Sequence, residues 1–143
     1  MNDLLLKQIL QTTRTIASVG LSSNPAKESY EIVEYLKGRK YYIIPVNPTA
    51  DIIMGAKAYP DLLSIPRTEK VDVVQIFRPS ADVPPVVDQA IQIGAKVVWM
   101  QVGVENVEAA VKAKEAGLEV VMNRCMRAEH RRLIGDGLLS FLK

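Results

Sequence analysis

A chain of 143 residues is long enough for one domain with a real hydrophobic core and too short for two ordinary domains. Its composition, 48% hydrophobic and 24% charged, is that of a globular protein and excludes the disordered, collagen-like and disulfide-scaffold classes. The net charge of +2, from 18 basic and 16 acidic residues, is too small for the phosphate neutralisation that nucleic-acid binding requires. We therefore expect a single domain over residues 1–143 and no nucleic-acid partner.

The amino end and the cysteine content indicate a cytoplasmic protein. Residues 1–4 have no cationic region ahead of their apolar side chains, as a secretory signal would have. No segment approaches the roughly 18 consecutive apolar residues of a membrane span. Cys125, the one cysteine, cannot form an internal disulfide, which suits a reducing compartment. We expect no membrane partner.

Short apolar runs alternate along the chain with segments of helical period, a pattern typical of parallel strands joined by crossover helices. The runs are nearly continuous and rich in β-branched residues, as strands buried on both faces are. Five strands are predicted, at residues 15–19, 41–46, 71–76, 96–101 and 119–122. A short extra strand is expected near residues 52–54.

Helices are predicted between these strands and at both chain ends. Gly94 and Gly117 directly follow helical runs, where glycine favours the left-handed cap. Pro84 and Pro85 fall in the first turn of a helix, where a missing N–H costs little. The predicted crossover helices cover residues 29–37, 61–65, 81–93 and 106–116. The expected fold is α/β: a doubly wound, mainly parallel five-stranded Rossmann-like sheet with helices on both faces.

Doubly wound sheets bind ligands beyond the carboxyl ends of their strands, where the strand order reverses. Five loops are predicted to lie at that edge, at residues 20–28, 47–49, 77–80, 102–105 and 123–127. We therefore look for binding residues in these loops.

The first loop combines the features of an anion-binding turn. Gly20 allows the backbone to approach a phosphate, small hydroxyl residues can donate hydrogen bonds, and the loop leads into a helix amino terminus. Lys27 adds a mobile cation. The alternative is an ordinary loop in which Ser29 is a simple N-cap. The candidate binding residues here are Gly20, Leu21, Ser22, Asn24, Pro25, Lys27, Ser29 and Tyr30.

The fingerprints of the common dinucleotide and ATP sites are absent. The chain has neither the three-glycine motif nor the Walker ending Gly-Lys-Ser/Thr. The second strand ends in Val46, Asn47 and Pro48, without the acid that binds the ribose hydroxyls of NAD. This uncharged turn tolerates a phosphorylated ribose, although Asn-Pro is also a common turn initiator.

Phe77, Arg78 and Pro79 follow the third strand and place an aromatic ring and a guanidinium group at the same edge. Arg78 can bind a phosphate through two hydrogen bonds or stack on a base. Phe77 equally suits the hydrophobic core. Trp99 lies inside a buried strand pattern and is interpreted as packing.

Cys125 and His130 are the residue types of a nucleophile–base pair, but their identity sets no mutual geometry. No orienting acid or oxyanion site accompanies them, and one cysteine with one histidine is too few for a metal site. No catalytic or metal-binding residue is therefore assigned. Cys125 lies between Arg124 and Arg127, which leaves open thiol exchange with a thiol cofactor.

Taken together, several motifs resemble the small stand-alone coenzyme A-binding domain proteins of bacteria and archaea. The motifs are VGLSSNP (19–25), IPVNP (44–48), VVQIFRP (73–79), GAK (94–96), WMQVG (99–103) and VMNRC (121–125). The resemblance covers nearly the whole chain, from about Thr15 to Leu133. The family is in turn similar to the nucleotide-binding domain of the succinyl-CoA synthetase α subunit. The implied ligand is coenzyme A (CoA), free or acylated.

The resemblance also implies a place for each loop. The residues it puts against the cofactor are Gly20, Leu21 and Ser22 at the pyrophosphate, Asn47 and Pro48 at the adenosine, Phe77 and Arg78 at the flanks, and Met100, Gln101 and Gly103 near the switch point. One departure is the pair Lys27-Glu28, where many relatives have Arg-Pro. The cation is kept, but Glu28 near a phosphate is unfavourable.

Three functions are compatible with these patterns. The leading hypothesis is a non-catalytic CoA-binding module (carrier, sensor or subunit), because the loops lack catalytic groups and the synthetase's phosphorylated histidine lies outside the matched part. The second is an NADP-dependent or acyl-CoA-handling enzyme, suggested by the Rossmann-like order and Cys125. The third is an interaction protein, a homo-oligomer or one whose sheet edge or terminal helices bind a partner.

Overall fold

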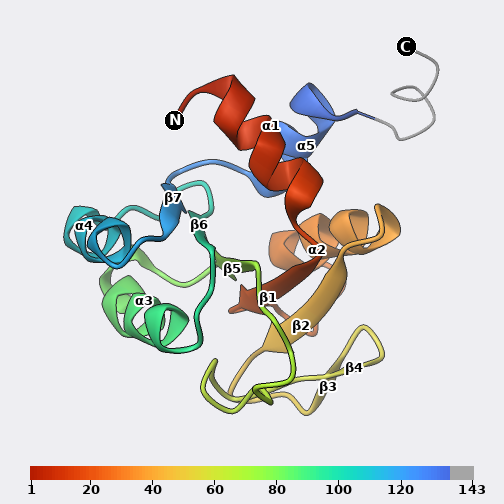
Figure 1. Ribbon diagram of the computed structural model, residues 1–143. Helices are drawn as coiled ribbons and strands as arrows, with labels where there is room; N and C mark the ends of the chain where they lie inside the picture. Colours follow the sequence, from red (N-terminus) through yellow and green to blue (C-terminus); the bar gives the residue numbers. More distant parts are fainter. Residues whose placement is uncertain (136–143) are drawn as a thin grey trace.

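The computed structural model describes residues 1–135, in which strands and helices alternate along the chain (Figure 1). The predicted domain extends beyond this part into residues 136–143, which lie outside the described residues. The elements are α1 (Asp3–Thr12), β1 (Thr15–Val19), α2 (Glu28–Gly38), β2 (Tyr42–Val46), β3 (Ile52–Ile53), β4 (Ala56–Lys57), β5 (Val73–Ile76), the short 3₁₀ helix η1 (Ser80–Asp82), α3 (Val83–Gln92), β6 (Val97–Met100), α4 (Val107–Glu115), β7 (Glu119–Val121) and α5 (Met126–Leu133).

Five strands form one parallel sheet in the order β2-β1-β5-β6-β7. The chain moves from β1 outward to β2 and then returns to the other side of β1 with β5. The strand order therefore reverses between β1 and β5, which makes their carboxyl ends the switch point of the sheet. The predicted doubly wound, five-stranded fold is confirmed.

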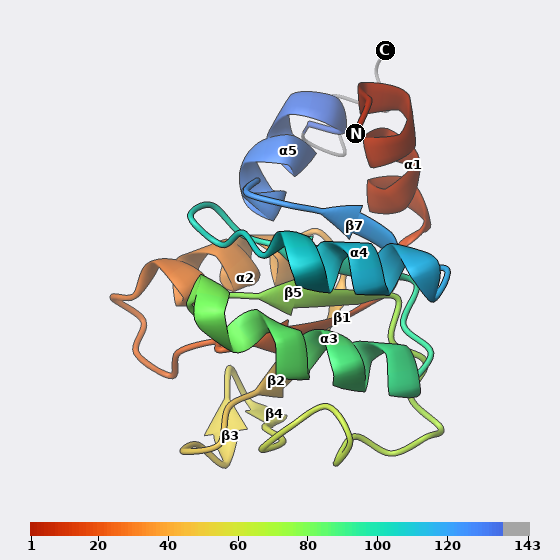
Figure 2. The same ribbon diagram turned by 90° about the vertical axis from the view of Figure 1, so that its left-hand side faces the viewer.

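Helices cover both faces of the sheet, and each face has its own hydrophobic core. Figure 2 shows α3 and α4 side by side in front of the strands, where they pack on residues such as Ala17, Val74 and Val98. On the opposite face, α1, α2 and α5 pack on Ile16 and Trp99. Successive residues of a strand point to opposite faces, so each strand contributes to both cores.

Trp99 is a packing residue, as predicted. Its side chain is fully buried, and its indole N–H donates a hydrogen bond of 2.8 Å to the carbonyl of Arg124. Buried tryptophans usually find such a partner for their one polar atom. The bond joins β6 to the turn that leads into α5.

The predicted helix over residues 61–65 is wrong. This segment is a single turn, in which the Asp61 carboxylate accepts hydrogen bonds from both the N–H and the hydroxyl of Ser64. It lies between Pro60 and Pro66, and Pro66 disfavours helical backbone at the residue before it. The apolar spacing that suggested a helix instead buries Leu62 against the sheet.

The expected extra strand near residues 52–54 is confirmed as β3, which forms an antiparallel hairpin with β4. Met54 and Gly55 make the turn and both have positive φ, 54° and 77°. Beyond the hairpin the chain returns to the sheet, where Tyr59 bridges to Val46 at the outer edge of β2. This route leads residues 60–62 to the carboxyl end of the sheet.

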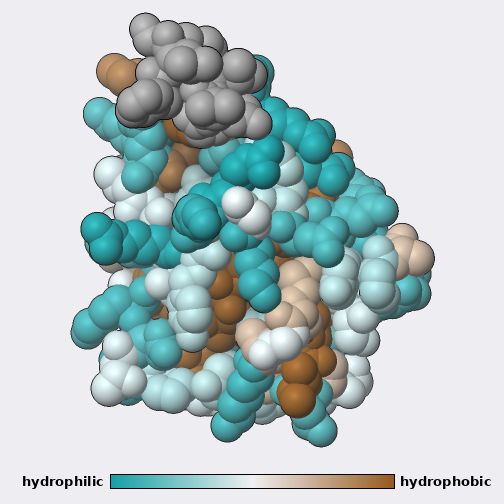
Figure 3. All heavy atoms as spheres, turned by 90° about the vertical axis from the view of Figure 1, so that its right-hand side faces the viewer, coloured by the Kyte–Doolittle hydropathy of each residue, from teal (hydrophilic) through white to brown (hydrophobic). Residues whose placement is uncertain are grey.

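The face that carries α2 and the β3–β4 hairpin is mostly hydrophilic, with hydrophobic surface gathered in its lower half (Figure 3). Ile52 of the hairpin and Tyr42 of β2 are exposed, at 67% and 55%. That a protein partner or a second copy of the chain covers such residues remains a prediction. Within residues 1–135, no helix combines the length and apolar character needed to cross a membrane.

A buried phenol ties α1 to the sheet. Tyr41 donates a hydrogen bond of 2.6 Å to the carbonyl of Leu10, one of the last carbonyls of α1, which the helix itself leaves unpaired. Burial, with a smaller contribution from Tyr35, raises the pKa of Tyr41 to about 12. The hydroxyl therefore stays protonated and keeps its donor role at neutral pH.

We expect Tyr41→Phe to lower the free energy of unfolding by about 1–3 kcal/mol, because it leaves a buried carbonyl without its partner. Urea denaturation followed by circular dichroism measures the change. The matched control is Tyr42→Phe, which removes the hydroxyl of an exposed neighbour and should change stability by less than about 0.5 kcal/mol. Equal effects of the two substitutions would contradict the assignment.

Candidate functional site

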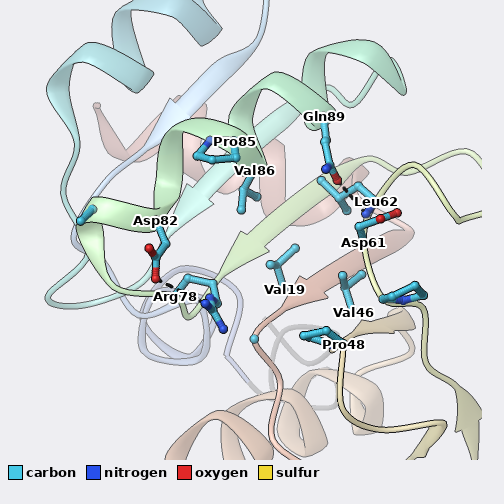
Figure 4. A pocket seen from close by; sticks show the side chains of 13 residues that line it. Val19, Val46, Pro48, Asp61, Leu62, Arg78, Asp82, Pro85, Val86 and Gln89 are labelled. Carbon is cyan, nitrogen blue, oxygen red and sulfur yellow. Dashed lines mark hydrogen bonds and ion pairs between the residues drawn. The ribbon is translucent and has the colours of Figure 1, made fainter.

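Two pockets open at the switch point and meet at Gly20. The first, which we call the α3 pocket, has a volume of about 340 Å³ and lies between the ends of β1 and β2 and helix α3 (Figure 4). Its lining consists of Val19, Gly20, Val46, Pro48, Pro60, Asp61, Leu62, Arg78, Ala81, Asp82, Pro85, Val86 and Gln89.

The second, the α2 pocket, has a volume of about 370 Å³ and lies beside the amino end of α2. Its lining consists of Gly20, Ser22, Lys27, Glu28, Ser29, Ile32, Phe77, Gln101, Val102 and Val104. The two pockets thus flank the carboxyl ends of β1 and β5, where doubly wound folds bind their ligands.

Gly20 forms the wall that the pockets share, and its position requires glycine. Its φ is +86°, in the left-handed region that side chains disfavour. A Cβ added there would lie 3.2 Å from Cδ of Arg78 and 3.4 Å from the carbonyl carbon of Phe77. The N–H of Gly20 donates to the carbonyl of Val46 at 2.9 Å, which fixes the turn to the end of β2.

Polar side chains of the first loop hold the loop itself. Asn24 accepts from the N–H of Ala26 through its side chain, and its own N–H donates to the hydroxyl of Ser22, each at 3.0 Å. Lys27 is the N-cap residue of α2 and makes no capping bond through its side chain. The first N–H groups of α2 therefore face the α2 pocket without a side-chain cap.

The interpretation of Ser29 as an N-cap is wrong, because α2 begins one residue earlier, at Glu28. The Ser29 hydroxyl oxygen instead accepts from the N–H of Ser22 at 3.1 Å, across the loop. Its own O–H can still donate. Ser29 thus braces the loop and lines the α2 pocket at once.

Asn47 joins the second loop to the first. Its side-chain N–H₂ donates to the carbonyl of Leu21 at 2.9 Å, and its side-chain oxygen accepts from both the N–H and the hydroxyl of Thr49 at 2.8 Å. Asn47 is therefore the turn former that its sequence context indicated. Its neighbours Val46 and Pro48 line the α3 pocket.

Phe77 and Arg78 point to different pockets. Phe77 lines the α2 pocket and also packs against the core on that face of the sheet. Arg78 lines the α3 pocket with a half-exposed side chain, and its guanidinium pairs with Asp82 at 3.3 Å (Figure 4). The aromatic ring and the cation thus stand on opposite sides of the switch point.

The structure brings about half of the predicted site residues into the pockets. Those that line a pocket are Gly20, Ser22, Lys27, Ser29, Val46, Pro48, Phe77, Arg78 and Gln101. Those that line neither are Leu21, Asn24, Pro25, Tyr30, Asn47, Pro79, Met100 and Gly103. Leu21 and Met100 are fully buried core residues.

Sequence reasoning missed the whole α3 wall. Asp82, Pro85, Val86 and Gln89 recur at the spacing of one helical face, a signal that could have been used. Residues 60–62 carried no such signal. They reach the pocket because the N–H of Leu62 donates to the side-chain oxygen of Gln89 at 3.0 Å (Figure 4).

Cys125 and His130 lie away from both pockets. Cys125 is the N-cap residue of α5, and His130 is 5% exposed in the same helix. The Nδ1 atom of His130 is 2.9 Å from the Tyr35 hydroxyl, and its ring meets those of Tyr35 and Tyr41 edge to face. No hydrogen bond joins Cys125 to His130 within residues 1–135, and this part of the chain holds no cluster of three metal-binding side chains.

Burial lowers the pKa of His130 below its usual value of 6.5, and the positive charge of Arg39 lowers it further. The unfolded chain therefore binds a proton near pH 6.5 that the folded chain takes up only at lower pH. We expect the free energy of unfolding to fall as the pH drops from about 7 to about 5.

His130→Gln should flatten this dependence, whereas Tyr35→Phe, which keeps the imidazole, should preserve it. Urea unfolding at the two pH values measures both slopes. An unchanged slope in His130→Gln would show that another group causes the pH dependence.

The fold and the site define a Rossmann-like α/β protein with an open binding edge at the switch point between β1 and β5. Residues 14–131 match the family model described as a CoA binding domain. The chain belongs to this family, which confirms the resemblance drawn from the loop motifs.

Three relatives illustrate the range of the family. The uncharacterized protein YneT of Bacillus subtilis is 38% identical over 125 residues, which cover 87% of this chain and 91% of YneT. The solved structure of a hypothetical protein from Pyrococcus horikoshii has a TM-score of 0.90 and 42% identity, and the match covers 94% of each chain. The ADP-forming acetate–CoA ligase II of Archaeoglobus fulgidus is 38% identical over 85 residues, 58% of this chain but 12% of the ligase.

Proposed function

We propose that this protein binds CoA, free or acylated, at the carboxyl edge of its sheet, with the nucleotide part of the cofactor spanning both pockets. The observation that carries the proposal is the junction at Gly20, where one turn lines both pockets beside the amino end of α2. An extended nucleotide with a central pyrophosphate matches two pockets with a backbone turn between them. Membership of the CoA binding domain family supports the choice of cofactor.

The α2 pocket suits the pyrophosphate and the chain that follows it. The amino end of α2 carries free N–H groups and the positive end of the helix dipole, which favour negative oxygen atoms. Lys27 supplies a cation and Ser29 an O–H donor in the same pocket. Ile32, Val102 and Val104 add apolar surface for an uncharged part of the cofactor.

The α3 pocket suits the adenosine. Much of its wall is apolar, with Val19, Val46, Leu62 and Val86 available to contact the flat base. The turn at residues 47–49, directly after β2, contains no acid that would repel a 3′-phosphorylated ribose. Two acids do line the pocket: Asp82 is paired with Arg78, and Asp61 accepts hydrogen bonds from Ser64. Arg78, whose side chain is 44% exposed, can stack on the base or pair with the phosphate.

We propose a non-catalytic role: a carrier, a sensor or a subunit of a larger assembly. Cys125 and His130, the two residues that suggested chemistry, line neither pocket. His130 is also buried and paired with Tyr35. The match covers 12% of the acetate–CoA ligase, so the proposed CoA binding does not imply ligase activity.

Calorimetric titration with CoA and dephospho-CoA tests the proposal. We expect saturable binding of CoA, weaker binding of dephospho-CoA and no change in nicotinamide fluorescence when NADPH is added. Absence of both heat and thermal stabilisation with CoA at high concentration would overturn the proposal. Tight binding of NADPH in place of CoA would instead favour the reductase alternative.

Gly20→Ala should weaken CoA binding by about tenfold or more, because the added methyl strains the left-handed turn and pushes the Arg78 side chain from its place in the α3 pocket. The matched control is Gly38→Ala, at an exposed position in the last turn of α2 where a Cβ meets nothing within 4 Å. The control should bind CoA as the wild type does. A folded Gly20→Ala protein with unchanged affinity would place the site elsewhere.

Glu28→Gln should strengthen CoA binding, by about twofold to fivefold at low salt, because it removes a negative charge from the pocket assigned to the pyrophosphate. Glu34→Gln, on an exposed stretch of the same helix, is the control for the change in net charge. The gain should shrink as salt is added, since the charges are partly exposed. A loss of affinity in Glu28→Gln would contradict the placement of the pyrophosphate.

A further inference from the structure

A line of polar side chains crosses the otherwise apolar sheet just below the site. Ser18 of β1 and Gln75 of β5 are fully buried, and Gln101, which follows β6, is 4% exposed. The hydroxyl of Ser18 donates to the side-chain oxygen of Gln75 at 2.9 Å, and the Gln75 amide N–H donates to Oε1 of Gln101 at 3.2 Å. The line ends at the α2 pocket, which Gln101 lines.

A backbone group fixes the direction in which the Gln101 amide points. The N–H of Met126, the first residue of α5, donates to Oε1 of Gln101 at 3.1 Å. A backbone N–H can only donate, so the atom facing α5 must be the oxygen of the amide. Nε2, the donor end, therefore faces away from α5.

Nε2 of Gln101 is a donor held ready without a protein acceptor. It makes no hydrogen bond within residues 1–135, and it is not fully buried. Polar groups on side chains as buried as Gln101 nearly always have a partner. In the free protein water can accept this hydrogen bond, and a ligand in the α2 pocket, which Gln101 lines, can take the place of that water.

We propose that Gln101 is a specificity-determining residue of the α2 pocket, whose Nε2 donates to an acceptor oxygen of the bound cofactor. The acceptor is a phosphoryl or an amide carbonyl oxygen, both of which CoA carries. Ser18, Gln75 and Met126 fix the orientation of the Gln101 amide, so the pocket presents a hydrogen-bond donor at this position. A ligand group that can only donate is therefore disfavoured there. The inference rests on the proposed CoA binding and adds the identity and direction of one contact.

Two substitutions separate this role from a structural one. Gln101→Glu keeps the shape and the oxygen that accepts from Met126 and Gln75, but turns an acceptor towards the ligand. Gln101→Met loses the hydrogen bonds to Met126 and Gln75 as well as the donor. Tighter CoA binding by Gln101→Glu than by Gln101→Met would indicate a structural role. A donor role predicts the reverse order, and it predicts that the reverse order persists at high salt, where repulsion between the new carboxylate and the pyrophosphate is screened.

We expect calorimetry to show CoA affinity reduced about fivefold in Gln101→Met and about tenfold to a hundredfold in Gln101→Glu. Gln92→Glu, an exposed change at the end of α3 with the same change in net charge, should bind as the wild type does. Titrations with ADP and with pantetheine identify the acceptor: a loss seen with ADP indicates a phosphoryl oxygen, and a loss seen with pantetheine indicates an amide carbonyl.

The wild-type protein provides an independent measurement should the variants fail to fold. In ¹⁵N-resolved NMR spectra the side-chain N–H₂ signals of Gln101 should shift on saturation with CoA, with the signals of the fully buried Gln75 as the internal reference. Gln101 signals that move no more than those of Gln75, or tighter CoA binding by Gln101→Glu than by Gln101→Met, would overturn the inference while leaving CoA binding intact. Failure of the wild type to bind CoA would overturn the proposed function itself.

Discussion

The site depends on the absence of a side chain at the point where the strand order reverses. β1 and β5 lie next to each other, but the helices that follow them cover opposite faces of the sheet, so the loops diverge beyond the strand ends. Gly20 lies where they part, with Arg78 on one side and the backbone of Phe77 close by. A residue with a Cβ would push these groups apart and distort both pockets. The ligand-binding edge therefore follows from one backbone conformation that only glycine adopts at low cost.

The fold was predictable because its signals are local. Strands buried on both faces consist of nearly continuous β-branched residues, and the predicted strands differ from the observed ones by a residue or two at their ends. The prediction failed over residues 61–65, where local periodicity and tertiary packing disagree. Leu62 and Ile65 are spaced as on a helix, but two prolines confine the segment to one turn. Their burial is set by the hairpin that returns the chain to the sheet.

The site was predictable to the extent that it is made of backbone. Gly20, the amino end of α2 and the Asn-Pro turn each follow from a few consecutive residues. The hydrogen bonds that orient the polar side chains of the site do not follow from neighbouring residues in the sequence. The hydrogen bond between Ser18 and Gln75 spans 57 positions of the sequence, and the bond between Gln75 and Gln101 spans 26. Such partners are known only once the strand order is known, so the sequence places Gln101 at the binding edge without showing which end of its amide faces the ligand.

The polar line through the sheet has no evident value for stability alone. Replacing both partners of a buried hydrogen bond by apolar groups of the same shape is often neutral or stabilising, and the remaining side chains of these strands are almost all apolar. What apolar residues cannot do is fix the direction of an amide. Each polar atom of the line makes at least one hydrogen bond up to Oε1 of Gln101, and among residues 1–135 the Nε2 atom of Gln101, at the pocket end, makes none. At the proposed site, fixed donors and acceptors are what can distinguish one ligand from another, and the hydrogen bonds that orient the Gln101 amide come from the sheet and from the start of α5.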